Sequence, residues 1–159
     1  MSLYYEKFNS TAYALKFAVK KGDIGVDYGV MPLEGLWWSD DMSTFSVENK
    51  ADWKWTLMIM QPEFVTRDLF AIALEQVKKK KNLNALTKLR LEAFAEGKSA
   101  QILYVGPFSE EGPTIESIHA YIKQNGYRVS GKHHEIYLSD ITKTAPDKLK
   151  TIIRQPIAK

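Results

Sequence analysis

The sequence of 159 residues contains no cysteine, so it forms no disulfide, no thiolate zinc site and no thiol nucleophile. No apolar run approaches the roughly 18 residues that a membrane-spanning helix needs. The first residues, MSLYYEKF, lack the basic and apolar segments of a signal peptide. We therefore expect a cytoplasmic protein without a membrane partner.

The sequence also has little excess of one sign of charge: 22 Lys and Arg residues and 19 Asp and Glu residues give a net charge of +3. The aromatic residues are not interleaved with Lys and Arg as they are in nucleic-acid stacking surfaces, and no helix-turn-helix or zinc-knuckle signature is present. We expect no direct binding of nucleic acid.

The common enzyme signatures GxGxxG, the Walker loop, the nucleophile elbow and HExxH are missing too. His133 and His134 are adjacent, so in a strand they face opposite sides and make a poor metal pair, and His119 lies far off in sequence. We expect neither a cofactor nor a metal site.

What the sequence does contain is a series of helix and strand patterns. Apolar spacing and turn residues predict helices over 5–21 (ended by Gly22), 66–80 (capped by Thr66) and 114–125 (capped by Thr114, ended by Gly126). Strands are predicted over 28–38, 53–60, 133–138 and 150–155, and a hairpin is predicted to pair 88–94 with 100–105. A polar loop is expected over 39–52.

Two parts of this series look alike. A helix, LEGLWW and TLMIMQP make up the first part, and a helix, HEIYL and TIIRQP make up the second, with Glu34 matched to Glu135. One such unit buries too little apolar surface alone, so two copies are expected to share one sheet. The second copy has a leading strand, Gln101 to Val105, that the first lacks.

This duplication predicts an α+β fold in one domain over 1–159, with two strand-helix-strand-strand units sharing an antiparallel sheet. The halves are about 5–62 and 98–157, joined by a helix and a strand over 63–97. The first strand of the first unit is expected to be absent, through loss or through shortening at the N-terminus. Because an open sheet edge tends to pair with another chain, we expect either a homodimer or poor solubility.

The stretch HHEIYLSD raises the question of function. His133, Glu135 and Tyr137 share one face of an extended chain, and His134, Ile136 and Leu138 share the other. One interpretation is an edge strand with a solvated face, since charged side chains are mostly exposed. The other is a binding site, because an acid among aromatic rings suits a flat or cationic ligand.

Aromatic residues are numerous on or beside the predicted strands. They exceed what one packed face needs, and they recur in both copies near a glutamate, although aromatic residues in strands more often form a core. The candidate ligand-binding residues are Trp37, Trp38, Trp55, Tyr104, Phe108, Glu135 and Tyr137.

Several segments resemble the GyrI-like small-molecule-binding family: MPLEGLWW, WKWTLMIMQP, LRLEAFAEGKSAQILYVGPFSEEGPTI, HHEIYLSD and PDKLKTIIRQPI, in this order between about Tyr13 and Ile157. The resemblance implies the duplicated strand-helix-strand-strand fold and a ligand cleft between the halves, which binds hydrophobic, often cationic compounds around an acidic residue. Relatives act in multidrug sensing or as stand-alone proteins, some of which hydrolyse cyclopropane-bearing genotoxins in detoxification. By position, the resemblance implies cleft roles for Trp37, Trp38, Glu111, Glu135 and Tyr137. Tyr104 stands where the family commonly has His.

Three functions remain open at this point. The first is binding of a hydrophobic or cationic small molecule without chemistry. The second is hydrolysis, with Glu135 and Glu111 as the catalytic acid and base. The third is a protein-binding, gyrase-inhibitor-like module, which requires an exposed apolar patch.

Overall fold

A computed structural model describes residues 2–40, 53–80 and 88–159 of the chain. These residues form two compact units. The helical unit comprises Met1–Met31 and Ile59–Phe94, and the sheet unit comprises Pro32–Met58 and Ala95–Lys159. Most of the predicted polar loop, residues 41–52, lies outside the described residues.

The helical unit is built from α1, Ser2–Lys21, and α2, Arg67–Lys80. Its buried core consists of Leu15, Val19, Val65 and Ala73. The predicted end of α1 is confirmed, since the Gly22 N–H donates to the Ala18 carbonyl at 2.9 Å. The predicted cap of α2 is also confirmed, because Thr66 Oγ1 accepts a hydrogen bond from the Leu69 N–H at 3.2 Å.

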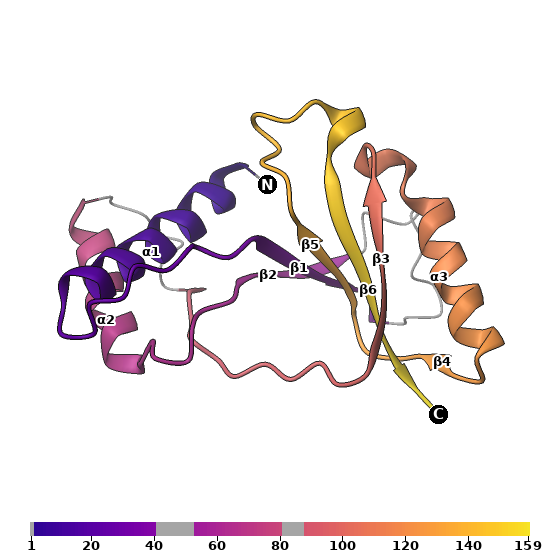
Figure 1. The fold of residues 1–159 in the computed structure, drawn as a ribbon, viewed down its shortest axis with the longest axis horizontal. Helices are drawn as coiled ribbons and strands as arrows, with labels where there is room; N and C mark the ends of the chain where they lie inside the picture. The colour runs from indigo at the N-terminus through magenta and orange to yellow at the C-terminus, as the bar shows by residue number, and fades with distance from the viewer. Residues whose placement is uncertain (1, 41–52, 81–87) are drawn as a thin grey trace. The chain divides into compact units, whose positions relative to one another are not determined.

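The described residues of the sheet unit form six strands: β1 Leu33–Trp38, β2 Lys54–Ile59, β3 Ser99–Val105, β4 Arg128–Val129, β5 His133–Tyr137 and β6 Lys150–Ala158 (Figure 1). Five of them follow the order β2-β1-β5-β6-β3, and β4 pairs with β6. The register between β1 and β5, between β5 and β6 and between β6 and β3 is antiparallel. This agrees with the predicted α+β fold and antiparallel sheet.

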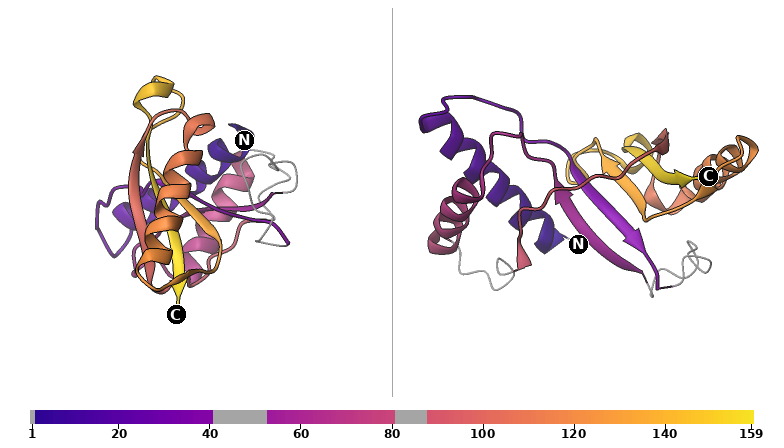
Figure 2. Two further views of the ribbon diagram at one scale, coloured as in Figure 1. Left: turned by 90° about the vertical axis from the view of Figure 1, so that its right-hand side faces the viewer. Right: turned by 90° about the horizontal axis from the view of Figure 1, so that it is seen from below.

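One face of β3 and β6 is covered by α3, Gly112–Gln124, which runs along these strands (Figure 2). The helix buries Ile115, Ile118 and Ile122, spaced so that they share one stripe, against Ile153 of β6. It ends as predicted at Gly126, whose φ of +73° an L side chain rarely adopts. Two 3₁₀ helices, η4 Phe108–Glu110 and η5 Pro146–Lys148, lie in the loops.

Two local predictions are wrong. Residues 89–97 form no strand, so the hairpin with 100–105 is absent; β3 pairs instead with β6 along its whole length, from Ser99 opposite Pro156 to Val105 opposite Lys150. Alternating side chains indicate an extended segment but not its partner. Thr114 also lies inside α3, where Glu111 occupies the N-cap position and Pro113 lies in the first turn.

The register between β1 and β5 determines which side chains share a face of the sheet. Gly35 lies opposite Glu135, Leu33 opposite Tyr137 and Trp37 opposite His133. The sequence comparison matched Glu34 with Glu135, but Glu34 lies opposite Ile136, so its side chain is on the opposite face of the sheet from Glu135.

Candidate functional site

The candidate site lies on one face of the paired strands β1 and β5. Strand alternation and the register place four side chains on the same face: Trp37, His133, Glu135 and Tyr137. We call these residues the Glu135 cluster. This face continues toward α3 on β6, which pairs with β5 so that Tyr137 lies opposite Thr151 and Glu135 opposite Ile153. By strand alternation, Gln155 of β6 lies on the same face.

A chain of hydrogen bonds connects the Glu135 cluster. Glu135 is 4% exposed, and its Oε2 accepts a hydrogen bond from the Tyr137 hydroxyl at 2.7 Å. The Tyr137 oxygen in turn accepts from the Trp37 indole Nε1–H at 3.1 Å. The other carboxylate oxygen, Oε1, lies 3.1 Å from Nε2 of the fully buried His133. The buried carboxylate is thus held at both oxygens, as burial of such a group requires.

Tyr137 acts as a donor in this chain because it keeps its proton. Burial raises the pKa of the Tyr137 hydroxyl far above its usual range, and the charge of Glu135 and the hydrogen bond to it raise it further. The Trp37 donor opposes these effects, and Glu111 adds to them. A carboxylate has about four lone-pair positions, so Glu135 can still accept hydrogen bonds or a cation from a ligand.

Gly35 provides the space in which Trp37 and Tyr137 meet. A Cβ atom at this position would lie 2.7 Å from Trp37 Nε1 and 2.8 Å from the Tyr137 hydroxyl. Both distances are shorter than real Cβ contacts, so a larger residue would force the two side chains apart. The hydrogen bond across β1 and β5 therefore depends on the absence of a side chain at Gly35.

Phe108 and Glu111 approach the cluster from the segment that leads into α3. The Phe108 ring meets the Tyr137 ring edge-on, with centroids 5.6 Å apart. Glu111, 2% exposed, occupies the N-cap position of α3, where the helix dipole favours a negative charge. Its charge contributes to the raised pKa of Tyr137, so both candidate carboxylates lie within electrostatic range of this hydroxyl.

Comparison with known proteins assigns the chain to a family. Residues 5–158 match the GyrI-like small molecule binding domain. The chain belongs to the GyrI-like family. An uncharacterized conserved protein from Listeria innocua is 38% identical with a TM-score of 0.87, and the match covers 97% of this chain and 78% of that one.

Two further solved structures similar to this GyrI-like chain are both described as hydrolases from Listeria innocua. Each is 37% identical; the TM-scores are 0.81 and 0.83, the matches cover 97% of this chain, and they cover 77% and 78% of the others. No protein with a curated function matches the sequence.

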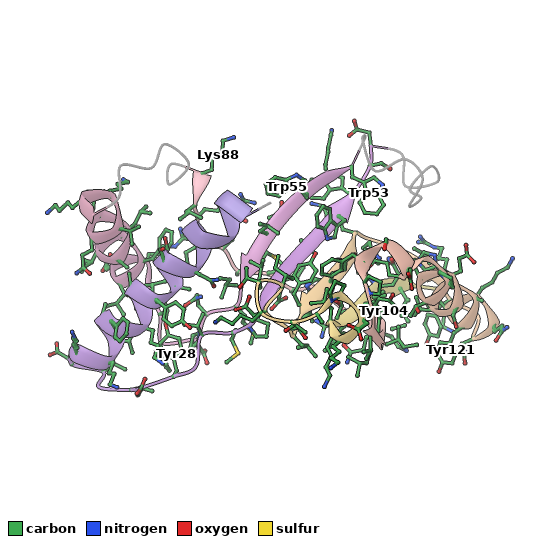
Figure 3. All side chains as sticks on the ribbon, turned by 90° about the horizontal axis from the view of Figure 1, so that it is seen from above. Tyr28, Trp53, Trp55, Lys88, Tyr104 and Tyr121 are labelled. Carbon is green, nitrogen blue, oxygen red and sulfur yellow. The ribbon has the colours of Figure 1, made fainter. Side chains whose placement is uncertain are left out.

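Three predicted site residues of this GyrI-like chain do not belong to the Glu135 cluster: Trp38, Trp55 and Tyr104. Trp38 alternates to the opposite face from Trp37, and the Lys132 ammonium sits 3.5 Å from the centre of its ring. Trp55 lies on β2 and is 43% exposed. Figure 3 shows Trp53 and Trp55 along the strand pair β1 and β2.

Tyr104 shares the face of the Glu135 cluster but lies on β3, beyond β6. It packs against the isoleucines of α3, and its hydroxyl donates to the Pro107 carbonyl at 2.9 Å. Burial raises the pKa of Tyr104, and Glu110 and Glu111 raise it further. Glu111 therefore influences both Tyr104 and Tyr137, and a binding role for Tyr104 stays a prediction.

Sequence reasoning missed several groups at this site. It assigned no role to Gly35 or His133, and it did not single out Trp53, whose ring lies 5.9 Å from that of Trp37. His119 of α3 was set aside as distant, yet it is close enough to His133 to interact electrostatically. Burial lowers the pKa of His119, a contact with Gln155 opposes this, and His133 lowers it further. The alternation of HHEIY was the one signal for His133.

Within 2–40, 53–80 and 88–159, no three His, Asp or Glu side chains are arranged to hold a metal ion. Likewise, no helix in the described part of the chain is long and apolar enough to cross a membrane.

Proposed function

We propose that this GyrI-like protein binds flat, hydrophobic and preferably cationic small molecules at the Glu135 cluster. The observation that supports this most directly is a carboxylate, 4% exposed, that lies beside Trp37 and Tyr137 and is held at both oxygens. Phe108, packed against Tyr137, and Trp53, packed against Trp37, extend the aromatic surface.

The preference for a cation follows from the electrostatics of a buried acid. Burial removes hydration from the Glu135 carboxylate, and the hydrogen bonds from Tyr137 and His133 replace only part of it. A cation stacked on the neighbouring rings would interact with both the carboxylate and the ring faces. A neutral ligand of the same shape would keep the stacking but lose the charge interaction.

A matched pair of probes tests this proposal. N-methylacridinium is a flat cation, and acridine at pH 8 is its neutral counterpart. We expect Glu135→Gln to weaken N-methylacridinium by about 1 to 3 kcal/mol, roughly 5- to 150-fold in Kd, the range for a charge-assisted contact. Acridine binding should change by less than about twofold. Fluorescence titration measures both values.

Glu116→Gln is the control, because it makes the same chemical change at an exposed position of α3 in the same unit. It should leave both affinities unchanged. If the native protein binds neither probe, or if Glu135→Gln and Glu116→Gln behave alike, the proposed site is wrong.

Hydrolysis is a second candidate function, favoured by the two 37%-identical proteins described as hydrolases and by the two buried carboxylates, Glu135 and Glu111. In this proposal one carboxylate accepts a proton from a water molecule while the water oxygen attacks a strained cyclopropane carbon. The ring C–C bond breaks, and its electron pair passes into the conjugated carbonyl of the substrate. Protonation of that oxygen by the second carboxyl group completes the net addition of water.

The test uses a spirocyclopropyl cyclohexadienone in H₂¹⁸O, with product followed by mass spectrometry beside a heat-denatured control. Turnover should add one labelled water, and Glu135→Gln should slow it by roughly a hundredfold or more, the usual share of a general acid or base. A native rate equal to that of the denatured control would exclude hydrolysis of this probe.

A further inference from the structure

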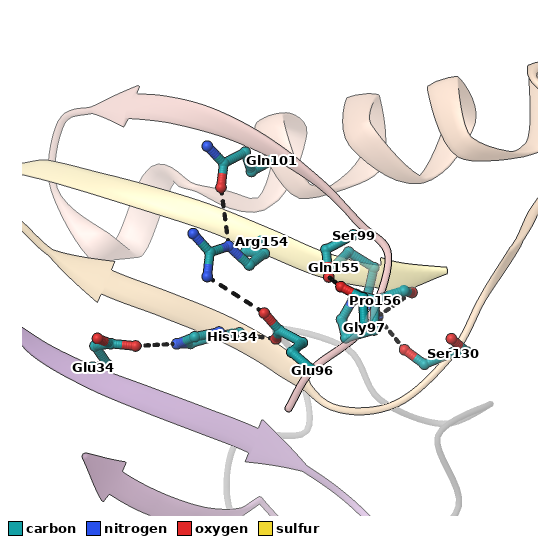
Figure 4. A network of polar contacts seen from close by, with 10 residues as sticks. All are labelled: Glu34, Glu96, Gly97, Ser99, Gln101, Ser130, His134, Arg154, Gln155 and Pro156. Atoms are coloured by element: carbon teal, nitrogen blue, oxygen red, sulfur yellow. Dashed lines mark hydrogen bonds and ion pairs between the residues drawn. The ribbon is translucent and has the colours of Figure 1, made fainter. Parts of the chain in front are cut away.

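The reverse face of the same strands carries a second polar network that the proposed function does not use. It consists of Glu34 on β1, His134 on β5, Arg154 on β6, Gln101 on β3, and Glu96 in the segment that precedes β3 (Figure 4). We call these five residues the His134 network. They join four strands and the 89–97 segment.

At the centre of this network, His134 is only 1% exposed. Its Nε2 lies 2.8 Å from a Glu34 carboxylate oxygen, and its Nδ1 lies 2.9 Å from a Glu96 carboxylate oxygen. The other Glu96 oxygen lies 3.4 Å from a guanidinium nitrogen of Arg154, and Arg154 Nε donates to Gln101 at 2.9 Å. Glu96 is thus held by two cationic partners.

The two carboxylates determine the charge of His134. A neutral imidazole carries one N–H, whereas an ionised carboxylate only accepts hydrogen bonds, so both contacts form together when both ring nitrogens are protonated. Burial lowers the pKa of His134, but the contacts with Glu34 and Glu96 outweigh it and leave the pKa raised. With His134 protonated the four ionisable groups balance in charge, and without that proton they carry one net negative charge.

The network and the Glu135 cluster share the strands β1 and β5. On one face Trp37 bonds to Tyr137 across these strands, and on the other face Glu34 bonds to His134 across the same strands. His134 is also the chain neighbour of both His133 and Glu135. A change in the Glu34–His134 contact therefore acts on the strand pair that positions the cluster.

We propose that His134 is a positioning residue: its doubly protonated ring fastens β1 and the segment at Glu96 to β5, and loss of one ring proton at higher pH loosens the Glu135 cluster on the opposite face. This inference rests on the proposed function for its biological meaning, because it assigns a regulation by pH to the same site. The structural part is testable without any ligand.

The direction of the pH effect follows from linkage. A histidine whose pKa is raised in the folded state stabilises that state fully below its unfolded pKa, about 6.5. This contribution is lost as the pH rises through the folded pKa. The groups that face His134 are Glu34, Glu96 and Arg154, while His133 and Glu135 point to the other face. The cluster is therefore held fully below about pH 6.5 and loosens as the pH rises through the raised pKa of His134.

The experiment is an NMR titration of the ligand-free protein between pH 5.5 and 9.5. It follows the indole N–H of Trp37, assigned by its loss in Trp37→Phe, and the ring signals of His134, assigned by their loss in His134→Gln. We expect both sets of signals to shift with the same midpoint. Glu96→Gln should lower that midpoint by about one pH unit or more, because it removes a carboxylate in direct contact.

Two further variants keep the inference testable. Glu34→Gln should lower the midpoint in the same way, which covers the case in which Glu96→Gln fails to fold. Glu116→Gln should leave the midpoint unchanged. The inference would be overturned if the Trp37 signal does not shift as His134 titrates. It would also be overturned if the midpoint is unchanged in both Glu34→Gln and Glu96→Gln. The outcome is separate from that of the proposed function, which the acridine probes test.

Discussion

Gly35→Ala is the smallest change that should disturb the Glu135 cluster. The new Cβ would lie 2.7 Å from Trp37 Nε1, 2.8 Å from the Tyr137 hydroxyl and 3.2 Å from Trp37 Cε2, all inside the 3.4 Å at which ordinary contacts begin. Relief requires Trp37 or Tyr137 to move, and this breaks their hydrogen bond.

The expected cost comes from two effects. Overpacking a closely packed site costs about 1 to 3 kcal/mol, and the lost hydrogen bond accounts for about 1 kcal/mol of that. Replacing glycine also restricts the unfolded chain, which favours folding by about 0.4 to 1 kcal/mol. Gly29→Ala measures the restriction of the unfolded chain alone, because a Cβ at Gly29 meets nothing within 4 Å. Relative to Gly29→Ala, Gly35→Ala should destabilise by about 1 to 3 kcal/mol.

The assay is urea unfolding followed by tryptophan fluorescence, since all four tryptophans lie in the sheet unit at positions 37, 38, 53 and 55. A double-mutant cycle then identifies the cause. In a Trp37→Phe background the indole nitrogen is gone, so the cost of Gly35→Ala should fall by about 1 kcal/mol. Equal costs for Gly35→Ala and Gly29→Ala, or an unchanged cost in the Trp37→Phe background, would refute the steric reasoning.

Further expectations concern other parts of the chain. Tyr137→Phe removes the 2.7 Å hydrogen bond to Glu135 and should destabilise the protein by about 1.5 to 3 kcal/mol in urea, and no change would contradict the described bond. Thr66→Ala should cost about 1 kcal/mol through loss of the α2 cap, with Thr66→Ser as the conservative control. If the edge beside β2 is open, light scattering should find a homodimer; a monomer would count against it. If residues 1–159 fold as one domain, limited proteolysis should release no stable half.

Much of this architecture could be predicted from the sequence, because the interactions concerned are local. The helix ending at Gly22 and the cap at Thr66 depend on residues a few positions apart. The shared face of His133, Glu135 and Tyr137 follows from strand alternation alone, and the short spacing is what allows Glu135 to bond to both neighbours. Membership of the GyrI-like family was also visible in the order of its motifs.

The remaining features depend on pairings between residues far apart in the chain, and these only the tertiary structure decided. Periodicity shows that a segment is extended but not which strand it joins, so β3 was assigned the wrong partner. The sequence comparison matched Glu34 with Glu135, but in the sheet Glu34 lies opposite Ile136 and therefore faces the other side from Glu135. On that other face Glu34 contacts His134. The same register places Gly35 opposite Glu135, and because Gly35 has no side chain, Trp37 and Tyr137 can meet there.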